Sequence, residues 1–102
     1  MQEKYIEALR TAAAEFLARE ANRNSLITVT RVEMRPDGKH AVIYITVFPE
    51  TAEAAALAFA NRNRGELGQF LLKRTKGMRI PKFEFEIDLG DKNRRRIDEL
   101  SQ

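Results

Sequence analysis

Seven lysine and arginine side chains lie between Arg62 and Lys82, together with one acid, Glu66, so this stretch carries a charge of +6. The whole chain carries +3, and the other residues therefore sum to −3. A basic segment on a slightly acidic body is typical of a surface that binds a polyanion through its phosphates. The residues that we predict to contact RNA are Arg62, Arg64, Gly65, Lys73, Arg74, Lys76, Arg79 and Lys82.

Residue types that carry out catalysis are scarce. The chain has no cysteine, which excludes disulfides and thiolate metal ligands, and His40 is its one histidine. A lone imidazole beside a turn has little support as a metal ligand or general base. The sequence also contains neither a nucleophile elbow nor a phosphate-binding glycine fingerprint. We therefore expect no enzymatic activity, no metal, no other cofactor and no small-molecule substrate.

The length of 102 residues fits a single domain with one core, spanning residues 1–102. The first residues lack the basic start and apolar run of a signal peptide, and no apolar stretch approaches the roughly 20 residues that span a bilayer. The absence of cysteine fits a reducing compartment. We expect a cytoplasmic monomer without membrane contact.

The first half of the chain predicts one helix and one β-hairpin. Apolar residues at steps of three and four indicate an amphipathic helix over residues 3–19. Two β-rich runs follow, Leu26 to Met34 and His40 to Phe48, joined by a turn with Pro36 and Gly38.

Alternation within these two strands predicts which face is buried. Charged Arg31 and Glu33 should face water, so the residues that alternate with them in the strand should face the core. Tyr44 would then lie on the outer face among carboxylates that repel phosphate, so we expect it to pack across strands instead of stacking a base. The inner face of the second strand should carry Ala41, Ile43, Ile45 and Val47.

The second half predicts two helices and a third strand. Alanine-rich residues 52–61 indicate a helix with Thr51 as its cap, and the helical pattern resumes at Glu66 after a weakened segment. Gly68, in the second helix, should be a close-packing residue. Alternating aromatics and acids predict a strand from Lys82 to Asp88. We expect residues 89–102 to form a short tail that contains a helix. The fold class is α+β, with a three-stranded sheet covered by helices on one face.

This order of elements is the type II KH arrangement, and three segments narrow it further. The hairpin from Val29 to Val47, the run R-I-P-K-F-E-F-E-I-D from Arg79 to Asp88 and the closing R-R-I-D-E-L from Arg95 to Leu100 resemble the ribosome-binding factor A family. The three occur in order, and the resemblance covers most of the chain.

The resemblance implies a helix–kink–helix in place of the usual KH glycine loop. In the family this kink is an Ala-x-Gly interruption, which falls here on Asn63, Arg64 and Gly65, with asparagine in the alanine position. A second interpretation takes Gly65 to Gly68 as a literal GxxG clamp. Glu66 opposes it, because a carboxylate in a phosphate-holding loop is repelled by the ligand.

The resemblance also implies a function: a non-catalytic assembly factor that binds the free small (30S) ribosomal subunit and its 16S rRNA and assists late 16S rRNA processing. RNA should approach from the helix side. The alternatives are a generic KH-like RNA-binding protein and a protein-interaction adaptor that uses the sheet edge. The run from Arg94 to Arg96 either adds an RNA contact or solubilises the tail.

Overall fold

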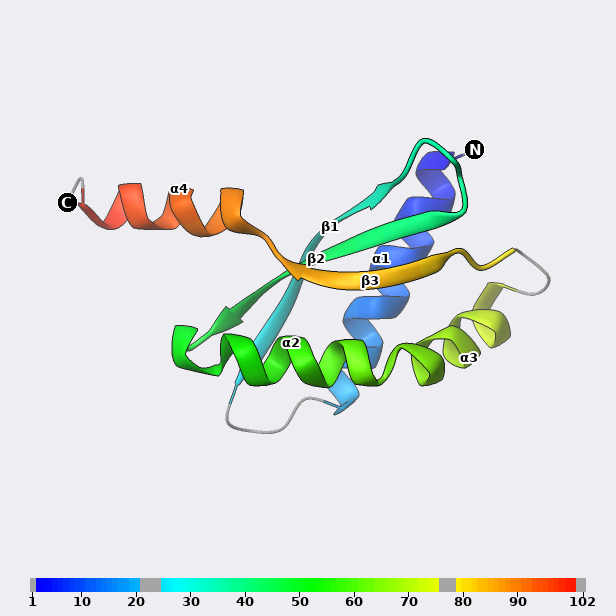
Figure 1. The fold of residues 1–102 in the computed structure, drawn as a ribbon, viewed down its shortest axis with the longest axis horizontal. Coiled ribbons are helices and arrows are strands. Elements are labelled where there is room, and N and C mark those ends of the chain that lie inside the picture. Colours follow the sequence, from blue (N-terminus) through cyan, green and yellow to red (C-terminus); the bar gives the residue numbers. More distant parts are fainter. Residues whose placement is uncertain (1, 21–24, 76–78, 101–102) are drawn as a thin grey trace.

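The computed structural model describes residues 2–20, 25–75 and 79–100, and its α+β class and order of elements are those that the sequence predicts (Figure 1). Both hairpin strands have the predicted ends. The elements are α1 (Gln2–Glu20), β1 (Leu26–Met34), β2 (His40–Phe48), a 3-10 turn η1 (Glu50–Ala52), α2 (Glu53–Arg62), α3 (Arg64–Thr75), β3 (Lys82–Ile87) and α4 (Leu89–Leu100).

The sheet has the order β1-β2-β3, with β2 in the centre. β1 and β2 pair antiparallel, whereas β2 and β3 pair parallel, which requires the long connection that α2 and α3 supply. Because parallel strands begin at the same edge, the tip of the β1–β2 hairpin lies beside the start of β3. His40 is the register partner of Lys82, and the Lys82 N–H donates to the Lys39 carbonyl at 2.9 Å.

The hairpin turn is fixed by one aspartate and one glycine. Asp37 Oδ1 accepts hydrogen bonds from the N–H groups of Lys39 at 2.8 Å and His40 at 3.2 Å, and Asp37 Oδ2 lies 2.7 Å from His40 Nδ1. Gly38 has a φ of 69°, a left-handed conformation that glycine adopts at little cost. The turn therefore holds the backbone and the imidazole of His40 in defined positions.

The core lies between one face of the sheet and helices α1, α2 and α3. The predicted inner face of β2 is confirmed, since its four alternating residues are all buried in the core. The helices cover this face with apolar side chains that are almost fully buried. They are Leu9, Ala13 and Leu17 of α1, Ala56 and Ala60 of α2, and Leu67 and Leu71 of α3. In Figure 1, α4 points away from this body.

A β-bulge interrupts β1 at Thr30, where the register with β2 shifts between Val29 and Arg31. Val29 and Val32 both point into the core although they are three positions apart, which unbroken alternation does not allow. The extra residue turns its side chain to the end of β3, where the Thr30 hydroxyl donates to Asp88 Oδ2 at 2.6 Å.

The roles predicted for Thr51 and Asp88 at element ends are wrong, and the ends of α1 and α2 and the start of α3 differ from the predicted ones by one or two residues. Thr51 does not cap a helix, because it lies inside η1, and Ala52 precedes α2 without a side-chain cap hydrogen bond. β3 ends at Ile87, one residue earlier than predicted, and Asp88 is 4% exposed instead of continuing the acidic outer face. The Asp88 carboxylate accepts the Asp91 N–H at 3.0 Å and so caps the start of α4.

Candidate nucleic-acid interface

The helical segment before β3 is interrupted at Asn63, between the end of α2 and the start of α3. Its φ of −99° and ψ of 16° are outside the helical range. The Asn63 side-chain amide donates to the Phe59 carbonyl at 2.8 Å, and the Leu67 N–H donates to the Asn63 carbonyl at 3.1 Å. The asparagine therefore ends one helix and begins the next.

Arg64 and Gly65 lie in the first turn of α3, and the helix continues through Gly68. The four residues of the possible GxxG clamp are thus helical and do not form a loop. A Cβ atom added at Gly65 or Gly68 would meet nothing within 4 Å. The expectation that Gly68 permits close packing is therefore wrong, and the bend depends on Asn63.

Asn61 fixes this interruption against the sheet, a role that the sequence analysis did not assign. Its side-chain Nδ2 donates to the Phe85 carbonyl at 3.3 Å, while its Oδ1 accepts the Phe85 N–H at 3.0 Å. The amide thus pairs with β3, a strand at the edge of the sheet, as the peptide group of a further strand would. The end of α2 and the start of α3 are held beside β3.

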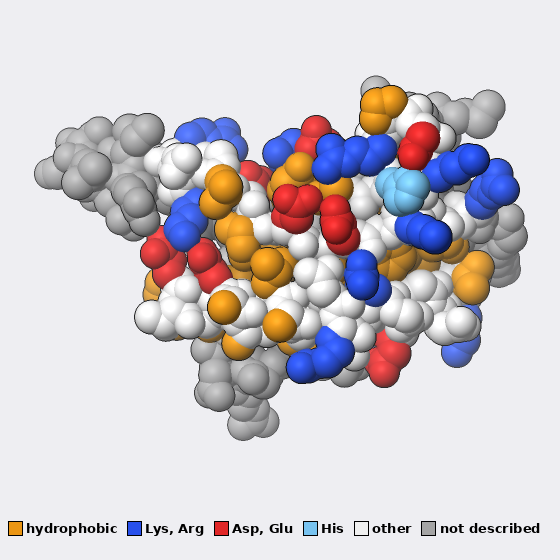
Figure 2. Space-filling model, in the orientation of Figure 1, with side chains coloured by type: hydrophobic (Ala, Val, Ile, Leu, Met, Phe, Trp, Pro, Cys, Tyr) orange, Lys and Arg blue, Asp and Glu red, His pale blue; other side chains and the backbone are white. Residues whose placement is uncertain are grey.

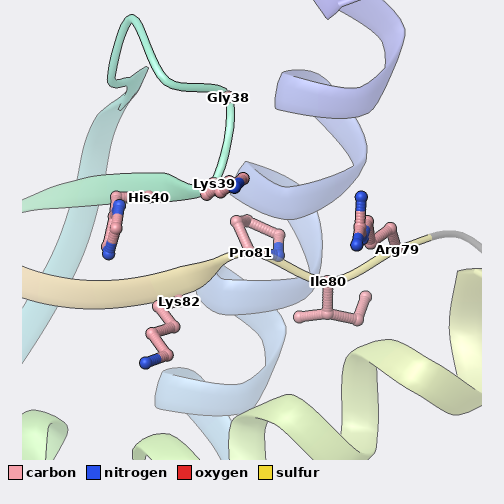
Figure 3. Close-up of a pocket in the computed structure, with 7 residues that line it drawn as sticks. All are labelled: Gly38, Lys39, His40, Arg79, Ile80, Pro81 and Lys82. Atoms are coloured by element: carbon pink, nitrogen blue, oxygen red, sulfur yellow. The ribbon is translucent and has the colours of Figure 1, made fainter.

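Three adjacent hollows lie along this end of the molecule and share Lys82. Their volumes are about 270, 330 and 370 Å³. The first is lined by Gly38, Lys39, His40, Arg79, Ile80, Pro81 and Lys82 (Figure 3). The second is lined by Arg35, His40, Ala41, Val42, Arg64, Lys82, Phe83 and Glu84, and the third by Arg64, Gly65, Lys82 and Phe83. Together they form a continuous path from the hairpin tip across β3 to the start of α3.

Positive charge gathers along this path. Figure 2 shows Lys and Arg side chains around His40, the one histidine of the chain, with one acidic side chain beside it and further acidic side chains nearer the middle of the same face. The lining residues include five cations and a single acid, Glu84. Such a path can attract an anionic chain.

The structure brings together only part of the predicted RNA-binding set. Arg64, Gly65, Arg79 and Lys82 line the hollows, whereas Arg62 and Lys73 are exposed outside them. Lys76 lies outside the described residues, as do the side chains of Arg95 and Arg96.

Arg74 is engaged within the fold. Its guanidinium pairs with Glu15 of α1 and lies 4.9 Å from the centroid of the Phe70 ring. These contacts join α3 to α1, a structural role that the basic pattern alone did not indicate.

Three lining residues of basic type were not among the predicted contacts: Arg35, Lys39 and His40. They belong to the hairpin, about 40 positions before β3 in the sequence, and the parallel pairing of β2 with β3 brings them to the site. The one sequence signal available was the presence of three basic residue types around a tight turn.

The aspartate of the hairpin is a fixed negative charge beside the path. The hydrogen bond from the Lys39 N–H, followed by that from the His40 ring, lowers the pKa of Asp37 below its ordinary value. Asp37 is therefore ionised at neutral pH, where it holds the turn and the His40 ring.

The outer face of the sheet is less suited to RNA. The Arg31 guanidinium lies 4.0 Å from the centroid of the Tyr44 ring and covers the surface on which a base would stack. Hydrogen bonding to Glu33, burial and the charges of Glu33 and Glu86 raise the pKa of Tyr44 despite nearby Arg31. This environment is acidic, as expected, and Tyr44 packs against its cross-strand partner Arg31.

Within residues 2–20, 25–75 and 79–100, no group of three or more His, Cys, Asp or Glu side chains is arranged to hold a metal ion. The described helices also include none with the length and apolar character to cross a membrane.

Comparison with known proteins decides the family. The profile of the ribosome-binding factor A family matches residues 1–101. The chain belongs to this family. A ribosome-binding factor A from Magnetococcus marinus is 30% identical over 102 residues, which covers 96% of this chain and 83% of that protein. The protein of that name from Thermobifida fusca is 34% identical over 100 residues, covering 95% of this chain and 66% of the relative.

Solved structures of ribosome-binding factor A show the same fold. The crystal structure of the Thermus thermophilus protein superposes with a TM-score of 0.73 at 27% identity, covering 85% of this chain and 96% of that one. A Thermus thermophilus homology model fitted into a cryo-EM map of a 30S complex gives a TM-score of 0.68 at 29% identity, covering 79% of this chain and 88% of the other.

Proposed function

We propose that this chain is a cytoplasmic assembly factor that binds the free 30S ribosomal subunit through 16S rRNA and assists the late maturation of that RNA. It acts by binding and performs no covalent chemistry. Two findings support the proposal: membership of the ribosome-binding factor A family and similarity to a member that was fitted into a 30S complex.

The observation that carries the RNA-binding part is the convergence of cations from three elements around Lys82. Arg64 comes from the first turn of α3, Arg35 from the hairpin, and Lys82 from the start of β3, and all three line one hollow. Lysine and arginine bind phosphate by charge-assisted hydrogen bonds and release the counterions of the nucleic acid. A path of hollows lined in this way suits a sugar–phosphate chain.

Replacing Arg64 and Lys82 together by alanine should weaken binding to free 30S subunits by roughly tenfold to a hundredfold at physiological salt. The slope of log K against log salt should become shallower by about one unit for each lost phosphate contact. Sedimentation of labelled protein with free 30S subunits over a salt series measures both quantities.

A matched double variant, Arg10→Ala with Arg19→Ala, removes the same charge from α1 and should change binding less than threefold if the contacts are local. Equal losses in the two folded double variants would contradict the proposed surface.

Binding to RNA without co-sedimentation with 30S subunits would instead indicate a generic KH-like protein. Failure to bind RNA at low salt would favour an adaptor, although the Asn61 amide already occupies the β3 edge at Phe85.

Gly65→Ala should separate stability from binding. The position is helical and a Cβ there meets nothing, so alanine should raise the free energy of unfolding by roughly 0.5–1 kcal/mol. The added methyl group enters the hollow shared with Arg64 and Lys82, and RNA affinity should fall. Urea unfolding and RNA titration of the same preparation test both effects.

Gly68→Ala is the matched control, since this glycine is in the same helix, has equally open space and does not line the hollows. It should stabilise the fold without weakening RNA binding. If both variants bind RNA as the wild type does, Gly65 does not contact the ligand.

A further inference from the structure

The hollow at the hairpin tip has a composition of its own. Its seven lining residues include Lys39, Arg79 and Lys82 as cations, the imidazole of His40, and Ile80 and Pro81 as apolar residues; none of these seven described residues is acidic. Figure 3 shows the group at the junction of the hairpin with the segment that leads into β3. The volume of about 270 Å³ is near the lower limit of small-ligand pockets.

The site is built by backbone contacts and does not depend on flexible side chains alone. The Lys82 N–H donates to the Lys39 carbonyl at 2.9 Å, and the Arg35 N–H donates to the His40 carbonyl at 2.8 Å. His40 and Lys82 are register partners, so their side chains emerge on the same face of the sheet. Asp37 further fixes the His40 ring through Nδ1.

We propose that this hollow holds one nucleotide of a single-stranded RNA segment, beyond the helix-side contacts around Arg64. The phosphate lies among Lys39, Arg79 and Lys82, and the base packs against the His40 ring and the half-buried Ile80. Cations around a partly apolar surface with a planar ring are the features that single-strand sites combine. The inference rests on the proposed function only in taking RNA as the partner.

The occupant follows from charge and position. The hollow shares His40 and Lys82 with its neighbour, which continues to Arg64, so a chain bound there has a cationic path on which to proceed. Toward the end of β3, Glu84, which also lines the neighbouring hollow, and Glu86 are exposed and repel phosphates. We therefore expect the bound single-stranded RNA to run from α3 to the hairpin tip and not across the middle of the sheet.

The first test measures the affinity of the protein for a single-stranded RNA of about eight nucleotides, a length within the range of site sizes of single-strand binding proteins. Lys39→Ala should weaken binding roughly threefold to tenfold and reduce the magnitude of the salt slope by about 0.7, the value for one lost contact to a single strand. Arg10→Ala, which removes one charge from α1, is the matched control and should stay within twofold of wild type. Fluorescence anisotropy over a salt series gives both quantities.

Arg64→Ala in the same assay distinguishes the two proposals. If Arg64→Ala weakens binding while Lys39→Ala behaves like Arg10→Ala, the hairpin-tip site is wrong and the proposed function stands. If Arg64→Ala has no effect while Lys39→Ala weakens binding, the helix-side interface fails instead. If the wild type binds no RNA, both proposals fail. Inorganic polyphosphate of equal charge serves as competitor; if it displaces the RNA as well as unlabelled RNA does, the site takes a bare anion and the nucleotide assignment is overturned.

A second measurement tests whether the bound RNA lies near the hairpin turn, and it alters no residue that lines the hollow. Because the chain has no cysteine, Pro36→Cys introduces a unique thiol in the exposed turn for a benzophenone label. The labelled protein should crosslink to the RNA on illumination, and the equally exposed Thr11→Cys on α1 should give little product. Equal crosslinking from the two positions would overturn the inference.

Discussion

Replacing Asn61 with alanine is expected to lower the free energy of unfolding by roughly 2–4 kcal/mol. The substitution leaves both the N–H and the carbonyl of Phe85 without their partner, and the Phe85 residue is 2% exposed. A buried polar group without a hydrogen bond costs about 1–3 kcal/mol. Urea unfolding measures the loss, and amide exchange should show the Phe85 N–H among the groups that lose most protection.

Asn63→Ala provides the matched control two positions along the chain. The Phe59 carbonyl that receives the Asn63 amide also accepts the Asn63 backbone N–H at 3.1 Å, so it keeps a partner in the variant. We expect a cost below about 1 kcal/mol there. An Asn61→Ala variant no less stable than Asn63→Ala would mean that the contact with β3 contributes little.

The second large effect is expected at Asp88, the carboxylate that joins the β1 bulge, β3 and α4. Asp88→Ala should cost about 2–4 kcal/mol, because it removes the cap of α4 and leaves the Thr30 hydroxyl without the carboxylate. The Arg31 Nε, 3.6 Å from Asp88 Oδ2, also loses its buried counter-charge. Chemical denaturation at pH 7 measures this cost, and Glu84→Gln on the exposed face should remain within about 0.5 kcal/mol of wild type.

The charge of Asp88 should also make stability depend on pH. Burial alone raises the pKa of Asp88, but hydrogen bonds from the Thr30 hydroxyl and the Asp91 N–H, together with the Arg31 charge, hold it below the ordinary value. A carboxyl with a lowered pKa contributes stability above its unfolded pKa of about 3.9, and this stability is lost as pH falls through the folded value.

The isosteric variant Asp88→Asn isolates this contribution. The difference in unfolding free energy between wild type and Asp88→Asn should be constant from pH 7 to about pH 5 and should shrink as the pH falls below about 4. A difference that stays the same down to about pH 2.5 would show that the negative charge is not what the cluster requires.

The parts of the fold that could be predicted depend on local patterns. The hairpin strands were predicted with correct ends because a Pro-Asp-Gly turn separates two runs of β-forming residues. The inner face of β2 followed from one uninterrupted set of alternating apolar residues. The interruption before α3 was visible as a cluster of poor helix formers.

The parts that could not be predicted depend on contacts between distant segments. The role of Asn61 could not be predicted, since nothing in the local sequence shows that its amide meets β3. Asp88 continued the alternation of Glu84 and Glu86, but the strand ends before it and the Thr30 bulge supplies an inward partner. Arg74 was assigned to RNA because it belongs to the basic segment. Its partner Glu15 is on another helix, so the local sequence does not reveal the ion pair.

The parallel pairing of β2 with β3 has a consequence for how the chain folds. The β1–β2 hairpin joins neighbouring segments, whereas His40 and Lys82 meet only after a loop of about 40 residues has closed. Contacts across such long loops cost more chain entropy and slow folding relative to local ones. The hollow at the hairpin tip needs both strands, so a nascent chain or a partly folded species in which β3 has not docked lacks it.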